Sequence, residues 1–176
     1  MQFPKRPGDL RTEKMSERFT VSLTGHSSSG DDIQITPAQP DDLDAILEIE
    51  KGSFSDPWSR QGFEDALKYE YSALFAARVH DQVAGYCCLY HIMDEGEIVN
   101  VAVAETFRSR GIGERMLKEM LRFGMSKGVK RFILDVRVGN APAIKLYRKM
   151  GFCPLVLEKN FYESPLEDAW LMELKV

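Results

Sequence analysis

The chain has 176 residues, of which 44% are hydrophobic and 28% are charged, as in a soluble globular protein of one domain. Its formal net charge of -4 argues against nucleic acid as the main partner, because phosphate binding needs a basic face. No apolar stretch is long enough for a signal peptide or a membrane span, so we expect a cytoplasmic protein.

The chain has three cysteines, Cys87, Cys88 and Cys153. Two of them are adjacent in an apolar run, where neighbouring strand residues point to opposite faces. No C-x-x-C spacing indicates zinc or redox chemistry. We therefore expect reduced, buried cysteines, no metal site and no covalent role for a thiol.

The elements fall into two regions in chain order. Residues 1–31 are rich in Pro, Gly and Ser and form a poorly specified arm, in which residues 19–23 alternate as a short edge strand would. Residues 32–176 form a single domain. It begins with a strand at 33–35, a helix that starts after Asp41 or Asp42, and a second helix capped by Ser59.

The remaining pattern alternates between strands and helices. We expect strands at 72–79, 83–91, 97–103, 131–138, 152–162 and 167–176, and helices at 113–127 and 140–150. This order predicts an α/β fold, a mixed sheet covered by helices.

The most informative segment joins the strand at 97–103 to the helix at 113–127. Gly111 and Gly113 let a ligand approach the backbone, and the first amides of the helix would point toward it with the positive end of the helix dipole. Arg108 and Arg110 add positive charge. The segment is neither a Walker A loop nor a Rossmann fingerprint, so its local chemistry predicts an anion site without naming the anion.

Two motifs give this segment a context. Residues 108–113, Arg-Ser-Arg-Gly-Ile-Gly, resemble the [R/Q]-x-x-G-x-[G/A] signature of the Gcn5-related N-acetyltransferase (GNAT) family. Residues 140–152 resemble the N-x-x-A-x-x-L-Y-x-x-x-G-F segment of the same family. Within the family, the turn at 54–59, the strand at 100–103, Leu-Asp-Val-Arg at 134–137 and the segments at 160–162 and 167–169 resemble the RimI-type ribosomal-protein-alanine N-acetyltransferases.

The resemblance implies a mostly antiparallel sheet that splays at a parallel strand pair, with helices on both faces. Acetyl-CoA would lie in the splay as cosubstrate, its pyrophosphate on the glycine-containing loop. The cofactor-binding residues implied are Val101, Ala102, Val103, Arg108, Ser109, Arg110, Gly111, Ile112, Gly113, Glu114, Asn140 and Tyr147. Asn140 would also serve as the N-cap of its helix, a role that alone explains an Asn there.

The resemblance also implies direct transfer of the acetyl group to an amine. Tyr147 matches the family position of the acid that protonates the departing thiolate, since a phenol keeps its proton at neutral pH. The base is either Asp135, where the RimI-type motif has Glu, or Glu97, and the sequence does not choose between them. Trp58 and Tyr162 would line the acceptor site, although Trp58 could equally be a packing anchor.

Three functions remain open. The first is acetylation of a protein N-terminus, most plausibly that of a ribosomal protein beginning with Ala. The second is the same chemistry on a lysine side chain or a small amine. The third is a non-catalytic CoA-binding module, since a fold alone does not prove activity.

Overall fold

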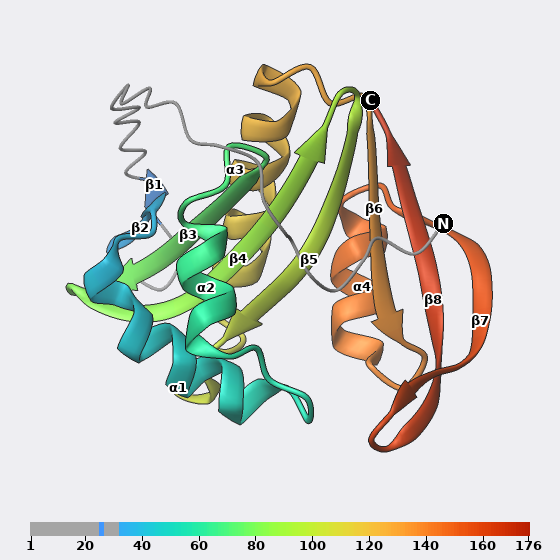
Figure 1. Cartoon of the computed structure of the whole chain (residues 1–176), viewed down its shortest axis with the longest axis horizontal. Helices are drawn as coiled ribbons and strands as arrows, with labels where there is room; N and C mark the ends of the chain where they lie inside the picture. The colour runs from blue at the N-terminus through green and yellow to red at the C-terminus, as the bar shows by residue number, and fades with distance from the viewer. Residues whose placement is uncertain (1–24, 27–31) are drawn as a thin grey trace.

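The computed structural model describes residues 25–26 and 32–176, which form one eight-stranded sheet with helices on both faces (Figure 1). The strands are β1 (Gly25–His26), β2 (Asp32–Pro37), β3 (Ser72–Val79), β4 (Gln82–Ile92), β5 (Glu95–Val103), β6 (Arg131–Arg137), β7 (Cys153–Glu163) and β8 (Leu166–Lys175). The helices are α1 (Leu43–Ser53), α2 (Arg60–Ala66), α3 (Ile112–Ser126) and α4 (Ala141–Lys149), with short 3-10 helices η1 (Pro40–Asp42) and η2 (Glu105–Phe107).

The predicted α/β class and the order of elements are confirmed. From residue 72 onward every β-strand and α-helix begins and ends within two residues of the predicted position, while the 3-10 helix η2 lies where a loop was predicted. The edge strand expected at residues 19–23 lies outside the described residues. No described helix combines the length and the apolar character needed to cross a bilayer.

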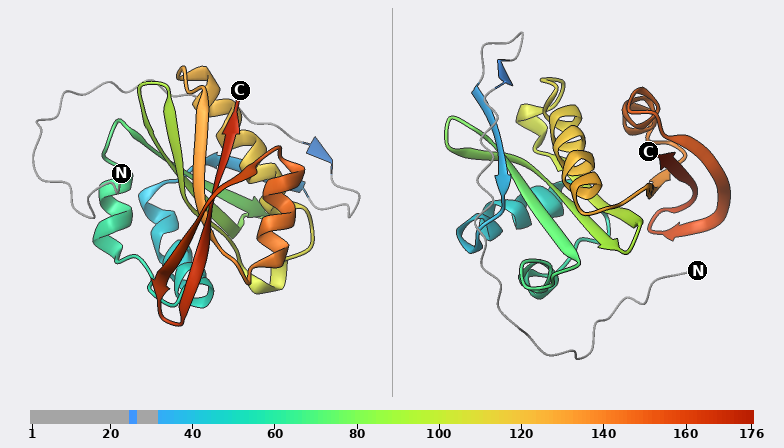
Figure 2. Two further views of the ribbon diagram at one scale, coloured as in Figure 1. Left: turned by 90° about the vertical axis from the view of Figure 1, so that its right-hand side faces the viewer. Right: turned by 90° about the horizontal axis from the view of Figure 1, so that it is seen from above.

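The two faces of the sheet are covered by different helices (Figure 2). On one face α3 buries Met116, Leu117 and Met120, which recur at helical spacing and therefore form a single apolar stripe. Tyr147 of α4 belongs to the same core. The opposite face carries α1 and α2, which pack Ile46 and Phe63 against β3 and β4. The sheet thus separates two hydrophobic cores.

The strand order is β1-β2-β3-β4-β5-β6-β8-β7, and all neighbours are antiparallel except β5 and β6. This parallel pair is short: Glu95, Gly96 and Glu97 pair with residues 131–133, and beyond that point each strand keeps only its antiparallel neighbour. Figure 1 shows β5 and β6 diverging from there. The predicted splay at a parallel pair is therefore present.

A β-bulge lies in β5 at the point where the strands part. Cys88 pairs with Asn100 and Leu89 pairs with Ile98, so Val99 is the extra residue. A bulge re-aims the side chains on either side of it. Because of this bulge, Glu97 and Asn100 both face α1 and α2, while Ile98 faces the α3 core.

Candidate active site

Among the described strands, the parting leaves one edge of β5 without a partner. There, Val101, Ala102 and Val103 pair with β4 alone. Backbone groups on such an edge can bind an extended ligand as an added strand would. These three residues, predicted to bind the cofactor, therefore lie on a suitable edge.

The start of α3 lies directly beyond this edge. Gly111 is the N-cap residue, with φ of 78°, and no side chain caps the helix. The helix begins with a bond from the Arg115 amide to the Gly111 carbonyl (3.2 Å), so the amides of Ile112, Gly113 and Glu114 have no partner within the helix. The unpaired amides and the helix dipole favour an anion at this position.

The space around Gly111 is compatible with a ligand that approaches the backbone. A Cβ added at Gly111 would meet no atom of the described residues within 4 Å. At Gly113 an added Cβ would lie 3.3 Å from Leu146 Cδ2 of α4, so this glycine also serves the packing of α3 against α4. Within the described residues, the predicted anion site thus has amides without a partner in the helix and open space beside Gly111.

The two arginines of the loop bind the loop itself. Arg108 Nε donates to the Val103 carbonyl (3.1 Å), and Arg110 Nη2 donates to the Thr106 carbonyl (3.0 Å). Ser109 between them has a positive φ of 63°. The Arg108 and Arg110 side chains therefore help to hold the turn, and their charges remain next to the start of α3.

Asn140 caps α4, as its position predicts. Its Oδ1 accepts a hydrogen bond from the Ala143 amide (3.2 Å). The contact of Asn140 with a cofactor stays a prediction. The α4 terminus differs from that of α3, because its capping position is filled by a side chain.

Tyr147 extends from α4 into the core that α3 shares, where its side chain is 9% exposed and its ring centroid lies 6.0 Å from that of Phe152. Burial is the main reason that the pKa of the Tyr147 phenol is raised; Tyr162 and Cys87 add to it. The phenol therefore carries its proton at neutral pH, as a proton donor must.

The two candidate bases, Glu97 and Asp135, lie on the same face of the sheet. Phe132, Leu134 and Val136 of β6 point into the α3 core, so Asp135 points to the other side, toward which Glu97 also points. Burial raises the pKa of Glu97. Both carboxyls therefore flank the point at which the strands part.

Asp135 is the more perturbed of the two. Its Oδ1 is buried and has no hydrogen-bond partner among the described residues. Its pKa is raised to about 6, first by burial and then by the neighbouring carboxylates Glu158 and Glu97. Such a carboxyl is ionised at pH 7 to 8 and still basic enough to take a proton from an amine. Glu158, on β7, was not predicted.

The two residues predicted to line the acceptor site lie on opposite sides of these carboxylates. Tyr162 of β7 lies close enough to Asp135 for that carboxylate to contribute to its raised pKa, about 12, after the larger effect of burial. The Trp58 ring packs against Phe63 (5.3 Å) and Tyr90 (6.1 Å), and Tyr90 is the strand partner of Glu97. Trp58 therefore has the packing role that the sequence left open.

A buried hydrogen-bond network around Glu50 was missed. The Glu50 carboxylate, 1% exposed, accepts from the Trp58 amide (2.8 Å), Asn100 Nδ2 (3.3 Å) and the Tyr86 hydroxyl. It ties α1 to the α1–α2 connection and to β5. The signal was present in the sequence, since Glu50 lies four residues after Ile46 on the buried face of the helix.

The three cysteines lie on β4 and β7. Cys87 and Cys88 are buried, and burial raises the pKa of both thiols, so neither resembles an activated nucleophile. Cys153 is exposed on β7. Within the described residues no group of His, Cys, Asp or Glu side chains is placed to hold a metal ion.

The chain is similar in sequence and in fold to known acetyltransferases. Residues 43–152 match the model of the Acetyltransferase (GNAT) family. The chain is 34% identical over 133 residues to a putative [ribosomal protein bS18]-alanine N-acetyltransferase of Bacillus subtilis. The matched segment covers 75% of this chain and 88% of the relative. It is 31% identical over 137 residues to the [ribosomal protein bS18]-alanine N-acetyltransferase of Salmonella typhimurium, with coverage of 77% and 92%.

A solved structure is similar over most of its length. The crystal structure of the ribosomal-protein-S18-alanine N-acetyltransferase of Escherichia coli superposes with a TM-score of 0.75 at 28% identity, covering 82% of this chain and 94% of that one. The glycine-capped α3, the parted parallel strands and the matched family model lead to one conclusion: the chain belongs to the GNAT family of acetyltransferases.

Proposed function

We propose that this acetyltransferase transfers the acetyl group of acetyl-CoA to the α-amine of a protein N-terminus, with a ribosomal protein that begins with Ala as the favoured acceptor. Relatives at 34% and 31% identity that bear this activity in their names support the choice of acceptor. The single observation that carries the chemistry is the Asp135 carboxyl beside Glu97 where β5 and β6 part, with its Oδ1 buried and without a hydrogen-bond partner among the described residues.

The cosubstrate side of the site would be formed by β5 and α3. The free edge of residues 101–103 would bind the pantetheine amides, and the first-turn amides of α3 would bind the pyrophosphate. Acetyl-CoA supplies an acetyl group already activated as a thioester. The protein supplies position and proton transfer.

Proton transfer divides between two kinds of side chain. An α-ammonium group has a pKa of about 8 and must lose a proton before its nitrogen can attack. Asp135 Oδ1, which has no hydrogen-bond partner in the described part of the chain, takes that proton directly or through a water, with Glu97 as its neighbour. Tyr147 Oη holds the proton that the leaving thiolate requires.

The acceptor assignment is tested with a panel of amines. Purified protein and acetyl-CoA are incubated with peptides that begin with Ala, the same peptides with a blocked N-terminus and an internal Lys, and small polyamines. We expect acetylation of the free N-termini alone, read by mass spectrometry. Preferential acetylation of the blocked, Lys-containing peptides or of the polyamines would overturn the proposed acceptor, and failure to acetylate any amine would favour a CoA-binding module.

A further inference from the structure

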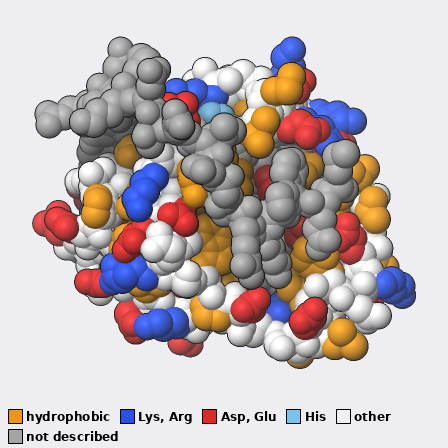
Figure 3. All heavy atoms as spheres, in the orientation of Figure 1, with side chains coloured by type: hydrophobic (Ala, Val, Ile, Leu, Met, Phe, Trp, Pro, Cys, Tyr) orange, Lys and Arg blue, Asp and Glu red, His pale blue; other side chains and the backbone are white. Residues whose placement is uncertain are grey.

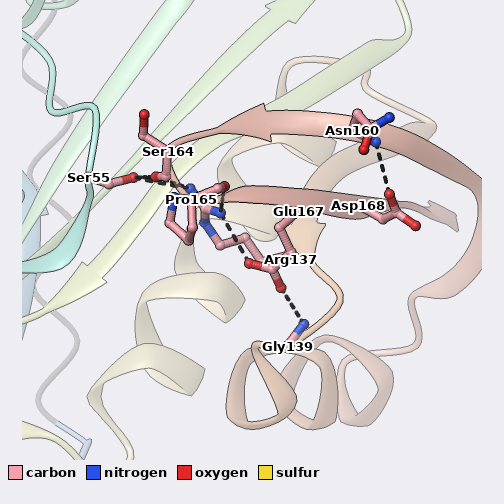
Figure 4. A network of polar contacts seen from close by, with 8 residues as sticks. All are labelled: Ser55, Arg137, Gly139, Asn160, Ser164, Pro165, Glu167 and Asp168. Carbon is pink, nitrogen blue, oxygen red and sulfur yellow. Dashed lines mark hydrogen bonds and ion pairs between the residues drawn. The ribbon is translucent and has the colours of Figure 1, made fainter.

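Arg137, at the end of β6, joins two segments that are far apart in the sequence (Figure 4). Its Nη1 donates to the Pro165 carbonyl and to Glu167 Oε2, both at 3.1 Å. Its Nη2 donates to the Ser164 carbonyl at 3.0 Å and to Ser55 Oγ at 3.1 Å. One guanidinium thus binds both the turn between β7 and β8 and the connection between α1 and α2.

The two segments also bind each other directly. Ser55 Oγ donates to the Ser164 carbonyl, although 109 residues separate the two in the chain. Glu167 in turn accepts from the Gly139 amide at the start of α4 (2.7 Å). The β7–β8 turn is therefore fixed to the α1–α2 connection, and the start of β8 is fixed to the connection that precedes α4.

These segments flank the proposed base. Trp58 of the α1–α2 connection packs on Tyr90, beside Glu97. Tyr162 of β7 lies beside Asp135, and the Arg137 guanidinium carbon lies 4.0 Å from the centroid of its ring. Arg137 is on the same face of β6 as Asp135, two residues further along. It therefore contacts both sides of the acceptor region without being a base or an acid itself.

We infer that Arg137 is the positioning residue of the acceptor site: it fixes the separation of the α1–α2 connection and the β7–β8 turn and holds the ring of Tyr162. The inference rests on the proposed function, because it assumes that the acceptor amine is bound between these segments. Lysine could not replace it, since an ammonium lacks the planar fork of donors that reaches four acceptors in two segments.

The experiment compares Arg137→Lys with Arg131→Lys. Arg131 is on the same strand and also pairs with two acidic residues, Glu95 and Glu173, but at the far end of β6. We expect Arg137→Lys to raise the KM for the acceptor by about tenfold, the value of one or two lost charge-assisted hydrogen bonds, with the KM for acetyl-CoA unchanged. Arg131→Lys should leave both constants close to those of the wild type.

The inference is overturned if Arg137→Lys leaves the acceptor KM unchanged, changes both KM values equally, or behaves like Arg131→Lys. Should Arg137→Lys fail to fold, Ser55→Ala decides: it removes only the hydroxyl between the two segments and should raise the acceptor KM by about threefold. If the acceptor proves to be a small amine, the proposed function fails while the same KM comparison still tests Arg137. If no amine is acetylated, hydrogen exchange tests whether Arg137 holds the β7–β8 turn. Exchange at residues 163–167 should then be faster in Arg137→Lys, and exchange in α3 should be unchanged.

Discussion

The chemistry of the site depends on where two carboxyl groups and one phenol are buried. Asp135 has a raised pKa because its side chain is withdrawn from water and stands beside the carboxylates of Glu158 and Glu97. Tyr147 has a raised pKa because it is buried in the core. Burial therefore keeps one group protonated at neutral pH and makes the other a stronger base.

Asp135→Asn should lower kcat/KM by roughly a hundredfold, the usual contribution of a general base. In the wild type, kcat/KM should fall as the pH drops below about 6, because Asp135 then becomes protonated. This acid limb of the pH profile should be absent in the variant. Tyr147→Phe is the matched control. It removes the proposed acid but keeps the contact with Phe152, so it should lower kcat and leave the limb in place. A limb that persists in Asp135→Asn and disappears in Glu97→Gln would assign the base to Glu97.

The stability of Asp135→Asn should show the same ionisation with a defined sign. Because the folded pKa is above the unfolded value, the folded wild type binds more protons and loses stability as the pH rises from about 4 to 6. Asn avoids this penalty. At pH 8 the variant should be more stable by about 1 kcal/mol, after allowance for solvent screening at a half-buried site, and at pH 3.5 the gain should vanish.

At the scale of the element, the starts of three helices differ in a way that matters for function. Ser59 caps α2 and Asn140 caps α4, each through a side-chain oxygen that accepts from a backbone amide. Gly111 begins α3 without any such oxygen. Of these three helices, α3 is therefore the one whose first amides meet no capping side chain among the described residues, which favours a phosphate there.

Gly111→Glu should abolish detectable binding of acetyl-CoA in isothermal titration, a loss of at least about a hundredfold, because a carboxylate would replace the phosphate at the amides. Gly128→Glu is the control. Gly128, after the other end of α3, also has a positive φ (90°) and open space around it, so the backbone strain is comparable. It should lose stability without losing affinity. Equal affinity losses in the two variants would show that strain, and not the anion site, explains the result.

Local patterns predicted these elements well because caps, glycines and apolar spacing act over a few residues. The strand ends, the Ser59 cap and the Asn140 cap all follow from neighbours in the sequence. The helical spacing indicates that Glu50 is buried, but it does not reveal its partner Asn100, 50 residues away, or the contact of Arg137 with Ser55, 82 residues away. The sequence alone also did not choose between Asp135 and Glu97 as the base, because the burial of Asp135 and the position of Glu158 depend on the assembled sheet.

Across the whole molecule, the sheet consists of two halves that are joined by a short strand pairing. Charged side chains of both signs are interspersed on the face shown in Figure 3. Strands β1–β5 join β6, β8 and β7 through the short β5–β6 pairing. The site lies where this pairing ends, so its geometry depends on how firmly the halves are held together.

Phe132 stabilises this connection between the two halves of the sheet by packing against α3. It is fully buried on β6, and a Cβ added at Gly124 of α3 would lie 2.6 Å from its Cε1. The ring therefore packs directly on the helix backbone and ties the second half of the sheet to the helix that covers the first. Asp135 lies three residues further along the same strand. A displaced Phe132 would move the carboxylate with it.

Gly124→Ala should therefore destabilise the protein by about 1 to 3 kcal/mol in urea unfolding, as overpacking does, although Ala favours a helix more than Gly does. Gly52→Ala in α1 is the matched control, because an added Cβ there meets nothing within 4 Å among the described residues; it should stabilise the protein by up to about 1 kcal/mol. Gly124→Ala should also lower kcat, since Phe132 can yield only by moving β6. If both alanines stabilise the protein and leave kcat unchanged, Phe132 adapts without moving β6. Contacts other than that of Phe132 with α3 would then hold the active site in place.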